Sequence, residues 1–148
     1  MGQVVVGVDG SEQSILALRW AMEEASVRQG WSVEAIITWT YPVMATDGFS
    51  GGAGLIGLDP AVLAEGARQR LEAAIQAACP DELERQKIKR TVQEGGAGHV
   101  LVEASRGAQL LVVGSRGHGG FTDLLLGSVS SQCVHHAHCP VTVIRPPS

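Results

Sequence analysis

The sequence has few of the residues that characterise extracellular and membrane proteins. Three cysteines occur among its 148 residues, an odd number, and none forms a Cys-x-x-Cys pair. This does not favour a disulfide framework, so we expect a reducing compartment, the cytoplasm. No apolar run approaches the ~20 residues that cross a bilayer. Met1 leads into the apolar run 4–6 without a basic segment or a cleavage site, so we expect neither a secretory signal nor a membrane partner.

Positive charge is also scarce. The chain has two lysines, Lys87 and Lys89, and a formal net charge of −4. Because nucleic-acid-binding proteins present a basic face, we expect no nucleic-acid partner. Hydrophobic residues make up 45% of the chain and charged residues 18%, which predicts a folded domain over residues 1–148.

Five segments are typical of β-strands. Three of them, residues 4–8, 35–37 and 110–113, are continuous apolar runs. Strands that are apolar on both sides are covered on both faces, which indicates a parallel sheet between two layers of helices. Residues 88–93 alternate apolar and polar side chains, and residues 141–144 lie between two prolines, so both segments are predicted to be edge strands.

Four helical segments separate these strands. Ser11 is a predicted N-cap for the first helix, which ends before Gly30, and Asp59 with Pro60 begins the second, which ends before Pro80. A third helix is expected over 98–106 and a fourth from about 127 to 137. The predicted fold is therefore α/β, a doubly wound five-stranded parallel sheet with order 3-2-1-4-5 and helices on both faces. Ligands bind such sheets where the order reverses, here between strands 1 and 4.

A glycine-rich loop leaves strand 4 at this reversal point. It begins at Gly114 and meets the fourth helix at Gly127 and Ser128. Glycines allow backbone N–H groups to approach a ligand, and a helix start adds unpaired donors, so the loop is a candidate phosphate cradle. The alternative is an ordinary flexible loop. A Walker A loop is excluded because Gly127, not lysine, precedes Ser128, and a dinucleotide fingerprint is excluded because Thr122 replaces its third glycine.

The spacing of these glycines resembles a family motif. Gly114, Gly117, Gly127 and Ser128 match the pattern G-2x-G-9x-G-[S/T] of the ATP-binding branch of the universal stress protein family. The segments 6–11, 111–117, 126–130 and 138–141 extend the resemblance along the whole chain. Two departures, Ala97 where the family often has proline and Gln109 where it often has aspartate, lie outside the motif.

This resemblance implies a binding site for ATP with Mg²⁺. Gly7 and Asp9 would line the nucleoside side, and the backbone near Trp39 would meet the adenine edge. Some relatives prefer cyclic AMP, and the motif leaves that choice open. The resemblance assigns the ribose and phosphates to Gly114, Ser115, Arg116, Gly117, His118, Gly119 and Gly120, and the phosphate tail to Gly127, Ser128, Val129 and Ser130. The hydroxyl groups of Ser128 and Ser130 are candidate donors, whereas the Arg116 side chain either adds charge or faces water.

Several candidates keep a structural alternative. Asp9 either faces the ligand or forms a turn, and His118 is either a phosphate contact or a loop residue. Residues 41–58 form either a lid or a disordered loop. A second cluster is either a metal site or the end of a helix that histidines stabilise: Cys133, His135, His136, His138 and Cys139.

No arrangement of nucleophile and base or of paired carboxylates stands out in the sequence. We therefore predict an adenine-nucleotide-binding regulatory protein. The alternatives are an ATPase or nucleotidyl transferase that uses the same cleft, and an interaction module that binds no nucleotide. The predicted edge strand 141–144 is apolar except for Thr142 and carries no charge, so it invites pairing with a second copy. We expect a homodimer through this strand, as the family resemblance also implies.

Overall fold

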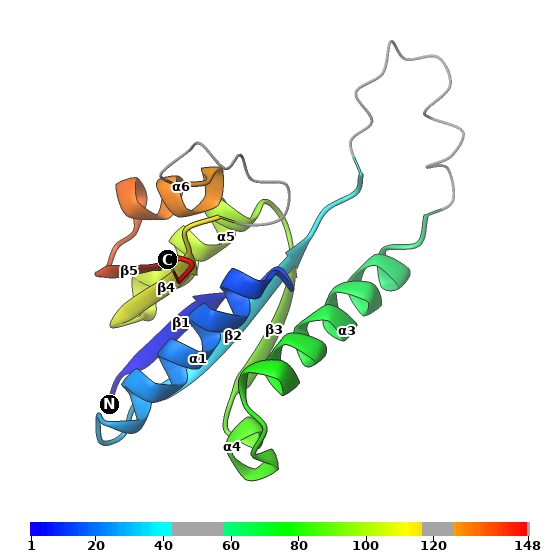
Figure 1. Ribbon diagram of the computed structural model, residues 1–148. Coiled ribbons are helices and arrows are strands. Elements are labelled where there is room, and N and C mark those ends of the chain that lie inside the picture. Colours follow the sequence, from blue (N-terminus) through cyan, green and yellow to red (C-terminus); the bar gives the residue numbers. More distant parts are fainter. Residues whose placement is uncertain (43–57, 117–125, 148) are drawn as a thin grey trace.

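The computed structural model describes residues 1–42, 58–116 and 126–147. Its five strands form one parallel sheet with the predicted order, β3-β2-β1-β4-β5, so the order reverses between β1 and β4 (Figure 1). The two strands predicted as edges, β3 and β5, are the edges. The strands are β1 (Gln3–Gly7), β2 (Ser32–Trp39), β3 (Lys89–Glu94), β4 (Leu110–Gly114) and β5 (Val141–Ile144).

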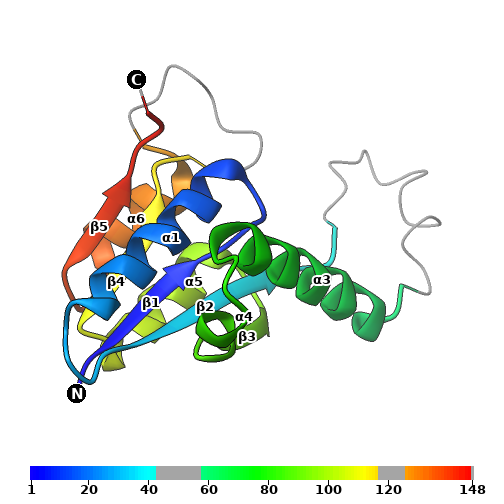
Figure 2. The ribbon, with the colours of Figure 1, turned by 60° about the horizontal axis from the view of Figure 1, so that its bottom comes forward.

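Helices cover both faces of this sheet. Helices α1 (Glu12–Ser26) and α3 (Pro60–Ala78) lie side by side on one face, and α5 (Ala97–Ala104) and α6 (Ser128–His136) lie on the other (Figures 1 and 2). The larger core cluster is buried under α1 and α3 and includes Leu18, Leu71 and Ile75. The second cluster lies under α5 and α6 and includes Leu101 and Cys133. Both faces of the central strands are therefore largely apolar, as the continuous runs predicted.

The helix starts follow the predicted caps. The Ser11 hydroxyl accepts a hydrogen bond from the Ser14 N–H at 3.3 Å, and the Asp59 carboxylate accepts one from the Ala61 N–H at 2.8 Å. Both bonds satisfy donors that a helix start leaves unpaired. Within the described ranges, no helix is both long enough and apolar enough to cross a membrane.

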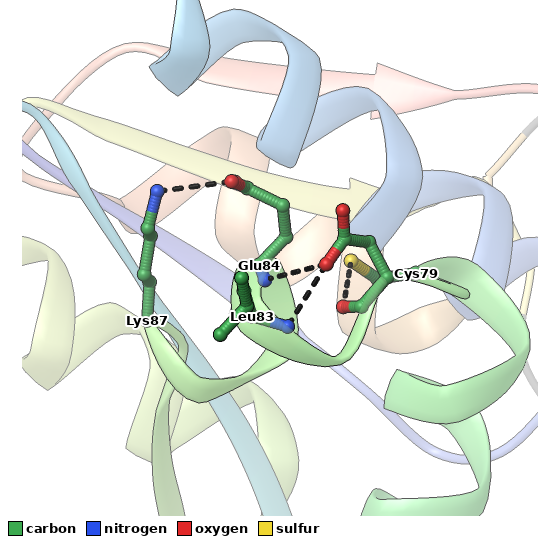
Figure 3. A network of polar contacts seen from close by, with 5 residues as sticks. Cys79, Leu83, Glu84 and Lys87 are labelled. Atoms are coloured by element: carbon green, nitrogen blue, oxygen red, sulfur yellow. Dashed lines mark hydrogen bonds and ion pairs between the residues drawn. The ribbon is translucent and has the colours of Figure 1, made fainter.

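One helix was not predicted from the sequence, since we expected no helix between Pro80 and the third strand. Helix α4 (Glu82–Gln86) is a single turn with no buried residue. The Asp81 carboxylate accepts hydrogen bonds from the N–H groups of Leu83 and Glu84, at 2.9 and 3.4 Å (Figure 3). An ion pair of 2.9 Å between Lys87 and Glu84 closes the turn. Capping and charge stabilise this helix instead of an apolar stripe, so periodicity did not reveal it.

Strand β2 begins at Ser32, earlier than the predicted run 35–37. The added residues pair with β1, although they include the charged Glu34. The Gln3 amide and the Thr91 hydroxyl donate hydrogen bonds to the Glu34 carboxylate at 2.8 and 2.6 Å. These partners come from neighbouring strands, so the polar residue is accommodated within the sheet. Other boundaries differ by one or two residues, and the predicted helix 98–106 is α5 followed by a 3₁₀ turn (Ser105–Gly107).

Candidate functional site

The carboxyl ends of β1 and β4 lie next to each other at the reversal of strand order. Strand β1 ends at Gly7 and leads through a tight turn into α1, and β4 ends at Gly114 and leads into the glycine-rich loop. In the turn after β1, the Asp9 carboxylate accepts a hydrogen bond from the Ser11 N–H at 2.9 Å. Gly10 has a φ of +89°, a left-handed conformation that glycine adopts without strain. Asp9 therefore has the turn role that we considered, and its nucleoside contact stays a prediction.

Gly7 and Gly114 allow helices to approach the sheet closely. A Cβ atom added to Gly7 would lie 2.6 Å from a methyl group of Leu101 on α5. One added to Gly114 would lie 3.0 Å from the Cβ of Gln13, on α1 at the other face. We expected these glycines to make room for a ligand. The structure shows that a side chain at either position would also press on one of the two helix layers.

Ser115 connects three elements where the loop leaves β4. Its N–H donates to the carbonyl of Ile144 on β5 at 2.8 Å, and its hydroxyl donates to the side-chain oxygen of Gln13 at 2.8 Å. Its carbonyl accepts from the Gly127 N–H at 2.6 Å and from the Ser130 hydroxyl at 2.9 Å. Both serine residues are 2% exposed. The two ends of the loop are therefore held together by buried hydrogen bonds.

The start of α6 is a favourable place for an anion. Gly127 is the N-cap and, having no side chain, makes no side-chain capping bond. The first N–H groups of the helix, on Ser128 and Val129, belong to the donors that an α-helix leaves without internal partners. The helix dipole adds partial positive charge at the same point. A phosphate group fits this arrangement.

Ser130 has a different side-chain role from the one we expected. Its hydroxyl points inward and donates to the carbonyls of Ser115, at 2.9 Å, and Gly127, at 3.2 Å. The hydroxyl proton is therefore shared between carbonyls at the two ends of the loop. A ligand contact of Ser130 through its backbone N–H stays a prediction, and so does one of Ser128, which lies exposed at the first position of the helix.

Trp39 lies at the carboxyl end of β2, on the same edge of the sheet. Its carbonyl accepts a hydrogen bond from the Gly95 N–H at 2.9 Å, which ties the ends of β2 and β3 together. Its ring contacts Tyr41 edge to face, with centroids 5.8 Å apart. The predicted adenine contact near Trp39 is not tested by these interactions.

Part of the predicted site lies outside the described residues. This holds for Gly117, His118, Gly119 and Gly120, and for residues 43–57 of the predicted lid. Arg116 is the last described residue before the loop, and its N–H donates to Gln13 at 3.1 Å. Gln13 itself was not among the predicted site residues. The only signal for it in the sequence is its place in the first turn of the helix after strand 1.

The Cys133 cluster does not have the character of a metal site. Cys133 is fully buried, and burial raises the pKa of its thiol to about 11, whereas a metal ligand must be a thiolate. The His135 ring nitrogen Nδ1 lies 2.7 Å from the Ser131 carbonyl oxygen. In the part of the chain that the structure describes, no three His, Cys, Asp or Glu residues gather as metal ligands. His135 and His136 lie in the last turn of α6, where positive charge is favourable.

The family model of the universal stress protein family matches residues 1–145 of the chain. A universal stress protein of Mycobacterium tuberculosis is 34% identical over 146 residues, which cover 98% of this chain and 48% of that protein. One of Mycolicibacterium smegmatis is 39% identical over 148 residues, covering 97% of this chain and 45% of the relative. The chain therefore spans about half the length of these curated relatives.

Solved structures share the fold. Universal stress protein UspA from Lactobacillus plantarum has a TM-score of 0.68 at 23% identity, with 97% of each chain covered. A universal stress protein in complex with cAMP has a TM-score of 0.57 at 25% identity, with 97% of this chain and 96% of that one covered. A family protein from Arabidopsis thaliana with AMP bound has a TM-score of 0.60 at 20% identity, with 100% and 94% covered.

Proposed function

The chain belongs to the universal stress protein family, and we propose that it binds an adenine nucleotide, ATP with Mg²⁺, where β1 and β4 end. The observation that carries this proposal is the start of α6. Its N-cap, Gly127, makes no side-chain capping bond, and the Gly127 N–H and the Ser130 hydroxyl donate hydrogen bonds to the buried Ser115 carbonyl, which hold the helix start beside the end of β4. A helix start at a reversal of strand order is a favourable place for phosphate.

Two family members described above support the choice of an adenine nucleotide, because one is in complex with cAMP and another has AMP bound. The glycine spacing of this chain favours ATP among such ligands. Gly127, Ser128, Val129 and Ser130 would hold the phosphate tail through backbone N–H groups and the Ser128 hydroxyl. Mg²⁺ would arrive with ATP and be held mostly by phosphate oxygens and water.

We further propose that the protein is a cytoplasmic regulator of a stress response. The sequence offers no nucleophile with a paired base, so binding is the expected activity. The competing proposal is an ATPase that works by positioning alone. Multiple-turnover phosphate release from ATP, at a constant rate and proportional to protein concentration, would favour the ATPase.

Nucleotide binding can be tested on the purified protein. Denaturation followed by chromatography of the released small molecules should yield an adenine nucleotide that was carried through purification. Calorimetric titration of nucleotide-free protein should then show tighter binding of ATP with Mg²⁺ than of cyclic AMP or AMP. No released nucleotide and no heat of binding with any of the three would refute the proposal, and a preference for cyclic AMP would replace ATP as the ligand.

We also propose a homodimer that forms through β5. All four residues of this strand are partly exposed, and among the described residues no strand pairs with its far side (Figure 2). The carbonyls of Pro140 and Ile144 accept hydrogen bonds from β4. Because backbone groups alternate in direction along a strand, the N–H and carbonyl of Val143 face the open edge.

A groove beside this edge extends the surface available to a second copy. It has a volume of about 300 Å³ and lies between α1 and the end of β5. Both apolar and charged side chains line it, a composition that suits a protein interface. The groove is lined by Leu16, Arg19, Trp20, Glu23, Ile144, Arg145 and Pro147.

Light scattering at micromolar concentration should give about twice the chain mass of 15.5 kDa. Val143→Pro removes an outward N–H without removing a donor to β4, so it should shift the protein toward the monomer. Val143→Ala keeps that donor and serves as the control. A wild-type mass near 15.5 kDa would refute the dimer.

A further inference from the structure

Gln13 reaches from the first turn of α1 to the beginning of the glycine-rich loop. Its side-chain oxygen accepts one hydrogen bond from the Ser115 hydroxyl at 2.8 Å and another from the Arg116 N–H at 3.1 Å. The two partners lie 102 and 103 residues further along the chain. One amide oxygen, with its two lone pairs, therefore binds both residues through which the chain leaves β4.

The position of this side chain is itself well determined. Its Cβ lies directly over Gly114, since a Cβ added there would be only 3.0 Å away. The helix that carries it is anchored against the sheet by the fully buried Ala17, Leu18 and Ala21. Gln13 is thus a rigid support for the loop, because its backbone cannot move away without unpacking α1.

The support extends to the proposed phosphate site through one residue. Ser115 donates its hydroxyl to Gln13, and its carbonyl accepts the Gly127 N–H at 2.6 Å. Gly127 is the N-cap of α6. The Ser115 carbonyl and the Arg116 N–H, which donates to Gln13, belong to the same peptide unit. The orientation of this unit therefore connects the side-chain amide of Gln13 to the start of the helix at which phosphate would bind.

We propose that Gln13 is a positioning residue for nucleotide phosphate: its side-chain oxygen orients the backbone of Ser115 and Arg116 and so fixes the carbonyl that binds the start of α6. This inference rests on the proposed nucleotide binding. It assigns Gln13 no contact with the ligand. Its effect should therefore depend on the acceptor oxygen and should be felt by phosphate more than by the nucleoside.

The test compares AMP with adenosine, which lacks the phosphate, by calorimetric titration of three variants. Gln13→Leu keeps the approximate size but removes the acceptor, leaving the Ser115 hydroxyl and the Arg116 N–H without their partner. We expect AMP affinity to fall about tenfold, the effect of one lost hydrogen bond of ordinary strength, while adenosine affinity stays within about twofold. Gln76→Leu, the same change at an exposed position of α3, is the control and should leave both affinities unchanged.

Gln13→Glu supplies the rescue, because a carboxylate oxygen can accept both hydrogen bonds. At roughly 0.5 M salt, where the repulsion between the new charge and phosphate is screened, it should bind AMP at least about threefold more tightly than Gln13→Leu. Ser115→Ala breaks the same interaction from the other side. Its loss should not add to that of Gln13→Leu in the double variant, because the two residues act as a unit.

The outcomes separate this inference from the proposed function. If wild-type protein binds AMP and Gln13→Leu binds it equally well, the positioning role is wrong while nucleotide binding stands. If Gln13→Leu weakens AMP and adenosine equally and Gln13→Glu restores neither, Gln13 merely stabilises the fold and the inference also fails. If wild-type protein binds neither AMP nor ATP, the proposed function itself is refuted.

Discussion

Adding one methyl group at Gly114 tests whether this glycine is needed for packing or for ligand approach. The Cβ of Gly114→Ala would lie 3.0 Å from the Cβ of Gln13, 3.3 Å from its carbonyl carbon and 3.4 Å from the Arg116 carbonyl oxygen. None of these atoms can move by rotating a flexible side chain. Relief requires α1 to move by a few tenths of an ångström away from β4, against its own buried contacts with the sheet.

The expected cost follows from two opposing effects. Overpacking of this kind destabilises by about 1–3 kcal/mol. Replacing glycine with alanine also restricts the unfolded chain, which favours the folded state by about 0.4–1 kcal/mol. The net destabilisation is therefore roughly 1–2 kcal/mol, which lowers the melting temperature of a chain of this size by roughly 2–8 °C.

Gly107→Ala is the matched control, because no atom lies within 4 Å of the Cβ it adds. Its unfolded-state effect is the same, so the difference between the two variants isolates packing at Gly114. Urea unfolding of both should show Gly114→Ala less stable by about 1–3 kcal/mol. Equal stabilities, together with weaker nucleotide binding by Gly114→Ala, would show that Gly114 serves ligand approach and would refute the packing argument.

Three further predictions address the site and the core. Gly127→Val places a branched side chain where phosphate approaches the start of α6; in an ATP titration we expect at least about a tenfold loss of affinity, about 1.4 kcal/mol, with the fold retained. Asp9→Ala should weaken binding of ATP with Mg²⁺ and, because it removes the acceptor of the Ser11 N–H, lower stability in urea by only about 1 kcal/mol; a larger loss of stability with binding intact would favour a purely structural turn. Burial raises the pKa of the Cys133 thiol from 9.0 to about 11. Between these pH values the unfolded chain releases a proton that the folded chain retains, so stability should fall as pH rises, by up to about 2–3 kcal/mol from this thiol. Cys133→Ala should reduce the slope, and the rest comes in part from Cys139, whose pKa burial also raises.

The order of the strands could be predicted because hydrophobic pattern and edge position are local properties. Residues 110–113 are apolar throughout, whereas 88–93 alternate, and these patterns correspond to a central strand and an edge. Helix α4 and the early start of β2 could not be predicted in the same way. The first depends on the cap at Asp81, and the second on partners that reach Glu34 from other strands.

In the candidate site, too, local sequence patterns could be predicted and contacts between distant residues could not. Glycine spacing identified both ends of the loop, and the structure joins these ends by the hydrogen bond between the Gly127 N–H and the Ser115 carbonyl. A fixed spacing encodes such closure, because the number of residues between two ends determines whether they can meet. It carries no information about which other element supports them.

Ser115 and Arg116 are supported by α1, which lies about a hundred residues earlier in the sequence. Gln13 approaches β4 because the order of strands places α1 over the β1–β4 boundary, and Gly114 is small because Gln13 lies there. A motif glycine can thus be required by a residue that is not part of the motif. The consequence for this site is that substitution of Gly114 and of Gln13 should have distinguishable effects. The first lowers stability by forcing two elements apart. The second leaves that packing in place and removes the hydrogen bonds to Ser115 and Arg116, so its cost comes only from the donors left without their acceptor.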